Sequence, residues 1–456
     1  MISDSCKIRS ASRWLALACL VVPMFGSYFF DDMFSSLSQL FRNPEMLELG
    51  WDSADYGFYA GGYSFLCVWG GLIVCGMLLD KWGVRITGSI FVGLMTAGAG
   101  TVTIALTSGL SPKGSLALAY VGCMVFGLGS EIAGVAVTRS IAKWFKGRNM
   151  ALAMGLQLAI ARLGTALALL LSPVLVATKP DGEIYRLMET ARPAFAGLIL
   201  LFAGTILWGI FVAMDARFDA ATGSTDKKET SEDDKFKFSD IFKVLSNKYF
   251  ILSALLCVFF YCSIISFKKF ATSILIPRFD LPVESASLMV SLIPFSTVIF
   301  APLFGSLVDK IGKGTRWMIS GSVLVLAAHL LIAFAPEGVN AYGYAAISML
   351  GVGYSLVPAA LWPTVSKIVP EKNLGTAYSL IYWIQNMGMM LVPIAVGLIF
   401  RNTVTEAGDI VQERSAALGA EYIFITLSLL AILVSCIYAR LSDKAPELGL
   451  DKPAGE

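Results

Sequence analysis

Long apolar runs and short polar stretches alternate along the whole chain. Each run is about 20 residues or longer, which is the length a helix needs to cross roughly 30 Å of hydrocarbon. Backbone groups in hydrocarbon must be satisfied inside their own segment, so such runs form helices rather than open strands. The pattern predicts an all-α membrane protein with twelve transmembrane helices in two six-helix bundles, at residues 14–36, 56–79, 86–107, 116–142, 150–176, 193–215, 249–276, 284–308, 316–335, 341–366, 374–400 and 420–440.

Composition supports this class. The chain is 56% hydrophobic and 15% charged, with a mean hydropathy of +0.71, well above the range of soluble proteins. Its eight cysteines fall mostly inside the apolar runs without the spacing of metal ligands or of a disulfide framework, so we expect them to pack as small apolar residues. No nucleophile–base set, metal cluster or nucleotide-binding loop stands out, so we expect no enzymatic activity, no metal and no cofactor.

The distribution of basic residues predicts the orientation. Net charge is only +2, but Lys and Arg are concentrated in alternate loops, the ones that lie on the same side as the N-terminus. Because loops rich in Lys and Arg stay in the cytoplasm, both termini are expected there. The run that begins at Trp14 follows a basic stretch like that of a signal peptide. It is too long for one and lacks a clear cleavage site, so we expect it to be the first helix.

The longest polar stretch divides the chain in two. Residues 217–247 are charged and poor in aromatic residues, which is typical of a flexible cytoplasmic linker. We therefore expect a six-helix bundle at 1–216, this linker, a second six-helix bundle at 248–442, and a cytoplasmic tail at 443–456.

The two halves are related in sequence. One motif closes the second and the eighth helix, with Gly, Asp, Lys and Gly at identical spacing in GMLLDKWGVR (Gly76, Asp80, Lys81, Gly83, Arg85) and in GSLVDKIGKGTR (Gly305, Asp309, Lys310, Gly312). A second relation has a constant offset of 224 and pairs Gly129 with Gly353 and Gly164 with Gly388. Six-plus-six parallel repeats with a site at their interface indicate one transporter architecture.

On these motifs the chain resembles the major facilitator superfamily. The string from Gly76 to Arg85 is similar to the cytoplasmic loop motif of that superfamily, and the partial echo at Gly305 is also typical of it. The resemblance implies alternating access by rocking of the two halves. Asp80, Lys81 and Arg85 would then form a charge latch at the cytoplasmic face. The motif says nothing about the substrate.

Glu131 and Arg162 are charged residues in the middle of two consecutive apolar runs. Glu131 lies 12 residues before Lys143 and Arg162 lies 14 residues after Arg148. At about 1.5 Å per residue, they lie roughly 18 and 21 Å from the cytoplasmic interface. Charges at that depth nearly always face a bundle interior or a cavity. An acid and a base at similar depth suggest a site for the two ends of a zwitterion.

The repeat sharpens this interpretation. At the offset of 224, Glu131 corresponds to Ser355 and Arg162 to Asn386, so only one half carries the charges. Such asymmetry favours a bound substrate, with Ser355 and Asn386 contributing from the other half. The alternative is an ion pair that ties two helices together, since buried pairs also occur as structural elements.

The stretch from Phe126 to Gly164, and RWLALACLVVPMFGSYFFDD at the start, are similar to one branch of the superfamily, the lysosomal dipeptide uniporters of the domain-containing protein 1 type. In that branch an acidic residue of helix 4 and an arginine of helix 5 hold the amino and carboxyl ends of a dipeptide. The resemblance implies these roles for Glu131 and Arg162. It also implies a facilitative carrier without obligatory proton coupling.

Four further charges lie toward the outer ends of helices 1 and 7, which are repeat equivalents. We predict that Asp31 and Asp32 pair with Lys268 and Lys269 and close an outer gate in the inward-facing state. The alternative is that these side chains reach individually toward the outer interface.

His329 is the only histidine and lies in the middle of the ninth helix. A proton relay is one role for it, but this helix is usually peripheral in the architecture, so a packing or helix-bonding histidine is the preferred interpretation. Tyr63, Tyr354 and Trp383 are expected to line the cavity.

The sequence therefore predicts a carrier of dipeptides or similar small zwitterions that works as a monomer in a lipid bilayer, without nucleic acid and without a sign of an accessory subunit. One rival is a carrier of organic anions or sugar acids, possibly coupled to protons, in which Arg162 with Lys268 or Lys269 would hold the anion and Glu131 would serve as a proton site. Another is a membrane receptor or scaffold without transport. Since no glycosylation sequon occurs, we expect a bacterial cytoplasmic membrane, or a lysosomal membrane if the protein is eukaryotic.

Overall fold

The computed structural model describes residues 10–145, 149–179, 183–222, 244–369, 374–406 and 408–453. In this part of the chain, twelve helical spans are long and apolar enough to cross a membrane, which confirms the predicted fold class. The main elements are α1 (Ser10–Asp32), η1 (Ser35–Arg42), η2 (Pro44–Met46), α2 (Ser53–Leu66), η3 (Cys67–Gly71), α3 (Leu72–Thr107), α4 (Pro112–Trp144), α5 (Met150–Val176), α6 (Leu187–Thr190), α7 (Arg192–Thr222), α9 (Lys248–Phe279), α10 (Val283–Ile311), α11 (Gly314–Phe334), α12 (Asn340–Ile368), α13 (Leu374–Thr403), α14 (Ile410–Asp443) and η6 (Pro446–Leu448).

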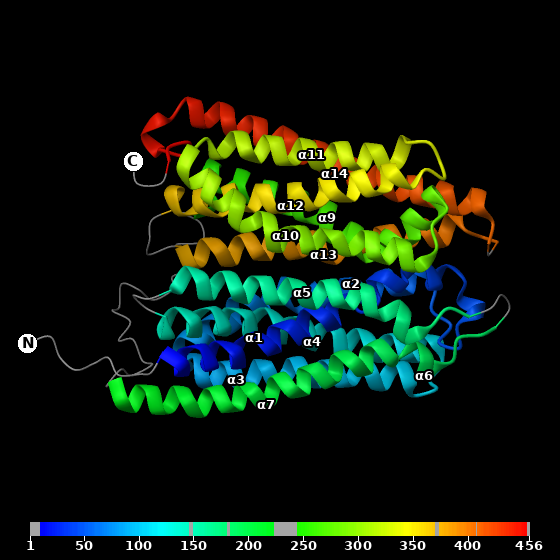
Figure 1. The fold of residues 1–456 in the computed structure, drawn as a ribbon, viewed down its shortest axis with the longest axis horizontal. Coiled ribbons are helices and arrows are strands. Elements are labelled where there is room, and N and C mark those ends of the chain that lie inside the picture. The colour runs from blue at the N-terminus through cyan, green and yellow to red at the C-terminus, as the bar shows by residue number, and fades with distance from the viewer. Residues whose placement is uncertain are drawn as a thin grey trace, which may run out of the picture.

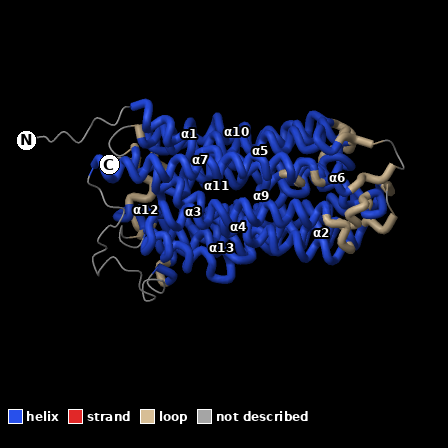
Figure 2. The backbone as a smooth tube through the Cα atoms, turned by 90° about the horizontal axis from the view of Figure 1, so that it is seen from below, coloured by secondary structure: helices blue, strands red, loops and turns tan. Residues whose placement is uncertain are grey.

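The helices form two bundles that lie against each other. Figure 1 shows the first bundle, α1 to α7, in the lower part of the view and the second, α9 to α14, in the upper part. The bundles meet where α2 packs against α13, α5 against α10, and η1 against α9. Seen from below, the helices lie along one common axis, and the loops gather at the two ends (Figure 2). Most of the predicted linker at 217–247, residues 223–243, lies outside the described residues, and α7 continues through its first part to Thr222.

The first turn of α1 and the last turn of α14 lie at the same end of the molecule (Figure 1). We call this the terminal end and the opposite one the far end. An even number of spans requires this arrangement, and it fixes which helix ends meet the cavity described below.

The repeated loop motif has a conformational basis. Gly83 interrupts α3 with φ 78°, and Gly312 ends α10 with φ 67°. Both angles lie in the region that side chains disfavour, so glycine suits the sharp turn from one span into the next. The second transmembrane span is also less regular than its apolar run indicated. It consists of α2, the π-helical η3 and the beginning of α3, with non-helical angles at Trp69 and Gly70.

Two spans differ from the predicted ranges in a way that matters for function. The first apolar run was expected to be helical through residue 36, but α1 ends at Asp32 and the 3-10 helix η1 follows. The last helix was expected to begin at residue 420, but α14 already begins at Ile410. Hydropathy does not detect these segments, because their polar side chains bond to protein rather than facing lipid.

At the terminal end of the first bundle, acidic residues of α7 form ion pairs with basic residues of α3 and α4. Lys143 Nζ lies 2.9 Å from Asp215 and 2.7 Å from Asp219, and Arg85 lies 3.3 Å from Asp219. Lys81, Asp309 and Lys310 are exposed, and the side chain of Asp80 lies outside the described residues. Arg85 of the predicted latch is therefore bonded to the last turns of α7, whose acids the sequence analysis did not single out.

In the second bundle the predicted tail supplies the corresponding acid. Asp451 accepts hydrogen bonds from the Thr315 backbone N–H (2.8 Å) and from the Ser442 hydroxyl (2.9 Å). Lys367 Nζ donates to the carbonyl oxygens of Gly449 and Lys452. The segment from 444 to 453 thus folds back over the terminal ends of α11, α12 and α14 and ties them together.

Candidate functional site

A cavity of about 1610 Å³ lies between the two bundles at mid-depth. Its lining runs from Asp32 and Lys268 at the inner limit to Arg139 and Tyr378 near the terminal end. The cavity therefore opens toward the terminal end and is closed toward the far end. Glu131, Arg162, Tyr63, Tyr354, Ser355 and Asn386, all predicted site residues, line it.

Glu131 is positioned by a close contact between α4 and α2. A Cβ on Gly127 would overlap the carbonyl oxygen of Tyr63, so only glycine allows the two helices to approach this far. Because of this approach, the Tyr63 hydroxyl donates to Glu131 Oε1 at 3.2 Å and lies 3.1 Å from Ser130 Oγ. Ser27 of α1 bonds to Ser130 in turn. Helices α1, α2 and α4 together fix the carboxylate at the cavity wall.

Arg162 is positioned by a similar contact between α5 and α1. A Cβ on Gly164 would overlap the carbonyl oxygen of Phe25, so α5 lies directly against α1 at this level. The guanidinium carbon of Arg162 lies 5.7 Å from the centre of the Tyr28 ring and 4.9 Å from that of Tyr354. Cation–π contacts of this kind favour a guanidinium that is shielded from water. Since Tyr354 belongs to α12, Arg162 also connects the two bundles.

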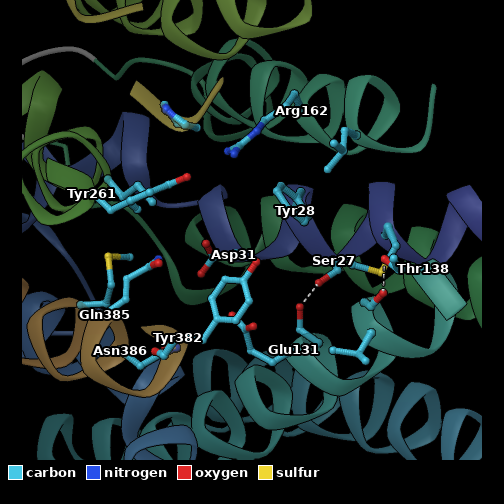
Figure 3. A pocket seen from close by; sticks show the side chains of 18 of the residues that line it. Ser27, Tyr28, Asp31, Glu131, Thr138, Arg162, Tyr261, Tyr382, Gln385 and Asn386 are labelled. Atoms are coloured by element: carbon cyan, nitrogen blue, oxygen red, sulfur yellow. Dashed lines mark hydrogen bonds between the residues drawn. The ribbon is translucent and has the colours of Figure 1, made fainter. Parts of the chain in front are cut away.

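The two charges do not neutralise each other. Neither Glu131 nor Arg162 forms an ion pair in the described part of the chain. Figure 3 shows them on opposite sides of the cavity, with Tyr28 and Asp31 between them in this view. Both side chains are partly exposed to the cavity, so each charge can meet a ligand there. The helix-tie alternative therefore does not describe this conformation, which leaves an acid and a base facing a common space.

The small polar residues of the second bundle are held by their own helices. Ser355 Oγ donates to the Gly351 carbonyl oxygen at 2.9 Å, and Asn386 Nδ2 donates to the Tyr382 carbonyl oxygen at 3.0 Å. Both residues are among those that line the cavity.

Trp383 is the one predicted wall residue that does not line the cavity. Its indole N–H donates to the carbonyl oxygen of Val68 at 2.6 Å. This carbonyl lies beside the irregular turn at Trp69 and Gly70, where the regular helix pattern is broken. The structure therefore places Trp383 at the contact between the bundles, where it completes the hydrogen bonding of a broken helix.

Tyr382 takes the cavity position instead. This residue is 39% exposed and lines the cavity. The sequence offered a signal for it, since Tyr382 lies four residues before Asn386 and so shares its helix face. Asp31 and Tyr28 also line the cavity, so the predicted gate and the predicted site share one wall.

The predicted gate residues lie at the inner limit of the cavity. Lys268 Nζ is 2.6 Å from Asp32 Oδ2, and Lys269 Nζ is 2.9 Å from Asp31 and 3.2 Å from Asp32. Thr165, three residues after Arg162 on α5, also donates to Asp32 Oδ2, at 2.8 Å. The ion pairs join α1 to α9 across the interface of the bundles. Opening and closing of this set stays a prediction.

The helix η1 closes the far end beyond these ion pairs. Ser38 Oγ lies 3.0 Å from Thr272 Oγ1 and 2.9 Å from Ser273 Oγ on α9. Arg42 forms an ion pair with Glu413 of α14. Sequence reasoning missed this closure because it treated residues 33–36 as the end of a membrane helix. The serine-rich stretch at 35–38 was the available signal.

His329 bonds to an acid that sequence reasoning also missed. Its Nδ1 lies 2.8 Å from Glu421 Oε2, and both side chains are fully buried between α11 and α14. The rings of Phe267 and Phe424 pack against the imidazole. The pair does not line the cavity. This placement agrees with a helix-bonding histidine.

The pair gives a testable distinction. Glu421→Ala should lower the free energy of unfolding by about 1–3 kcal/mol, because it leaves the buried imidazole without a partner. The double variant His329→Phe, Glu421→Leu should recover most of the lost stability and keep transport, because it leaves no buried polar group without a hydrogen-bond partner at this position. Thermal melts and liposome flux measure both quantities. A stable double variant without transport would instead assign the pair a role in proton movement.

The sequence matches a known family model. The model described as Major Facilitator Superfamily matches residues 24–393 and, in a second overlapping match, residues 264–455. The two matches together cover most of the chain, including every cavity residue described above.

Curated relatives match over most of their length. The Lysosomal dipeptide transporter MFSD1 of Mus musculus is 30% identical over 439 residues, which is 94% of this chain and 87% of that protein. The protein of the same name from Danio rerio is 31% identical over 396 residues, or 85% and 80% of the two chains.

A solved structure shares the fold. A bacterial homologue of the human lysosomal transporter Spinster, in an inward-facing and occupied conformation, superposes with a TM-score of 0.67 at 12% identity. The superposition covers 95% of this chain and 97% of the other. At that identity the likeness concerns the arrangement of helices alone.

Proposed function

The chain belongs to the major facilitator superfamily of membrane transporters, and from this premise we propose that it is a facilitative carrier, a uniporter, of dipeptides. Glu131 would bind the ammonium group of the substrate and Arg162 its carboxylate. The relatives whose names call them dipeptide transporters support this substrate class. The resemblance of the helix 4 and helix 5 segments supports the two roles.

One observation carries the proposal. Glu131 and Arg162 face one cavity without an ion pair between them, so a ligand with opposite charges at its two ends would neutralise both. A planar guanidinium fits a carboxylate with two parallel hydrogen bonds. The Tyr63 hydroxyl already orients the Glu131 carboxylate toward the cavity. A dipeptide also leaves its side chains free, and the volume of the cavity accommodates them.

We further propose that the terminal end faces the cytoplasm, because the basic loops lie there. The conformation described above is then the inward-facing one, with the far end closed by the Asp31, Asp32, Lys268 and Lys269 ion pairs and by η1. Rocking of the bundles about the α2–α13 and α5–α10 contacts would open the far end and close the other.

The same ion pairs argue against the organic-anion carrier. That alternative needs Lys268 or Lys269 beside Arg162 as an anion site, but both ammonium groups are bonded to Asp31 and Asp32. An anion would have to break a buried ion pair to bind there, at a cost of several kcal/mol. A zwitterion at Glu131 and Arg162 needs no such rearrangement.

Thermal shift in detergent, followed by flux into liposomes, tests the proposal. We expect dialanine and other neutral dipeptides to raise the melting temperature, and free amino acids, small organic anions and N-acetylated dipeptides to have little effect. Uptake of labelled dialanine should proceed without a pH gradient. Stabilisation by anions but not by dipeptides would contradict the substrate class, and uptake only with a proton gradient would contradict uniport.

A further inference from the structure

The cavity has one wall made of aromatic rings, all from the second bundle. Five rings form it, and we call them the aromatic wall: Tyr261, Tyr354, Trp362, Tyr378 and Tyr382. They come from α9, α12 and α13. None of them is needed to hold the two charges, apart from the contact of Tyr354 with Arg162.

The rings form a continuous surface with Trp362 at its centre. Ring centres lie 5.3 Å apart for Trp362 and Tyr382, 5.8 Å for Trp362 and Tyr378, and 6.4 Å for Trp362 and Tyr261. Tyr354 joins at 5.9 Å from Tyr261. The Trp362 indole N–H donates to the Tyr261 hydroxyl at 3.1 Å, so the polar group of the tryptophan is satisfied within the wall. Trp362, Tyr378 and Tyr382 are partly exposed to the cavity, whereas Tyr261 and Tyr354 are buried.

The first bundle lines the rest of the cavity with side chains of mixed size. Gly134, Thr138 and Gly155 are small, whereas Tyr28 and Tyr63 are aromatic. A flat group that enters the cavity can stack on the rings of the aromatic wall.

The wall begins at the proposed carboxylate site. Tyr354 packs under the Arg162 guanidinium at 4.9 Å and contacts Tyr261, which leads to Trp362. In a dipeptide, the C-terminal side chain is attached to the carbon that carries the carboxylate. A carboxylate held by Arg162 therefore brings that side chain to the rings. Glu131 lies instead among Ser27, Tyr63 and Ser130 of the first bundle.

We propose that the aromatic wall is a side-chain subsite that favours dipeptides with an aromatic C-terminal residue. The inference rests on the proposed function and adds a directional preference to it. Stacking of one aromatic ring on another contributes beyond the area that it buries, and the gain corresponds to about a threefold to tenfold change in affinity. A peptide with the reverse order presents its ring to the surroundings of Glu131, where Ser27, Ser130 and the Tyr63 hydroxyl are polar, and gains less.

Competition in liposomes tests the subsite. Uptake of labelled dialanine is measured against unlabelled alanylphenylalanine, phenylalanylalanine and alanyllysine. In the unmodified protein, alanylphenylalanine should inhibit at about threefold to tenfold lower concentration than phenylalanylalanine. In Trp362→Leu this ratio should fall toward one while dialanine uptake continues. Tyr382→Leu should lower the ratio as well, and its ring is 39% exposed, so its removal costs little folding energy.

The matched control is Phe202→Leu, which removes an exposed ring of α7 outside the cavity lining and should leave the ratio unchanged. Equal inhibition by the two phenylalanine peptides in the unmodified protein would overturn the inference, and so would a ratio that survives both substitutions. Stronger inhibition by alanyllysine than by alanylphenylalanine would replace the aromatic preference with a cationic one. Failure of dialanine itself to enter would refute the proposed function, and the subsite with it.

Discussion

Replacing Arg162 by alanine is expected to lower the affinity for dipeptides at least about thirtyfold and to abolish their uptake, while the fold stays intact. Removing one partner of a desolvated charge pair costs about 2–5 kcal/mol, which is roughly 30-fold to several thousandfold in affinity. The fold should survive because Arg162 forms no ion pair in the described part of the chain, and only its contacts with Tyr28 and Tyr354 are lost. Dipeptide titrations followed by thermal shift measure the affinity, and liposome flux measures the uptake.

Further variants separate charge from geometry. Arg162→Lys keeps the charge but not the planar fork, so it should bind dipeptides with an affinity between those of the parent and the alanine variant. Glu131→Gln should weaken binding of dipeptides more than binding of their N-acetylated forms, because it removes the partner of the ammonium group. Arg217→Ala, at an exposed position of α7 outside the cavity lining, is the matched control and should behave like the parent. Normal dipeptide binding by Arg162→Ala would show that the site assignment is wrong.

The architecture could be predicted from the sequence because hydrocarbon imposes a simple rule. Any span must be a long apolar helix, so the twelve runs and the repeat were sufficient to predict the fold. The same rule singled out Glu131 and Arg162, since a charge at mid-membrane is conspicuous in sequence. Both lie on the cavity.

Hydropathy was uninformative where polar groups bond to protein instead of lipid or water. It did not indicate η1, whose serines bond to α9, or the first turns of α14, which carry Glu413. It also missed Glu421, because a buried acid near the start of an apolar run looks like a residue at the membrane surface. His329 was visible in the sequence, but its partner is 92 residues away and only the fold brings the two together.

The apolar pattern alone did not decide between neighbouring residues on one helix, although the four-residue spacing from Asn386 favoured Tyr382. Tyr382 and Trp383 are adjacent aromatic residues of α13, and the rotation of that helix decides which of them faces the cavity. The structure directs Tyr382 inward and Trp383 toward the Val68 carbonyl. Helix rotation depends on packing with α2 and α9, and a periodic apolar pattern that is hydrophobic on most sides does not specify it.

Lys268→Ala is expected to open the far end and to stop net transport. Asp32 is 1% exposed and would keep its buried negative charge with Lys269 as its only ion-pair partner in the described chain. Breaking a buried ion pair by removing one partner costs about 3–5 kcal/mol. The conformation with a closed far end therefore loses most of its free-energy difference from the conformation with an open far end. Spin labels on Leu110→Cys and Val411→Cys, both exposed at the far end on different bundles, should then show a longer distance than in the parent.

Charge reversal distinguishes an ion-pair gate from a merely local defect. Asp32→Lys and Lys268→Asp should each lose uptake, because two like charges would then meet inside the protein. The double variant restores opposite charges on α1 and α9 and should recover both uptake and the short label distance. Recovery will be partial, since Lys269 and Thr165 also bond to Asp32 and would not fit the exchanged lysine. A double variant that is folded but as inactive as the single variants would refute the proposed ion-pair gate. The outer ion pairs would then serve only to hold α1 against α9, and closure of the far end would depend on η1 alone.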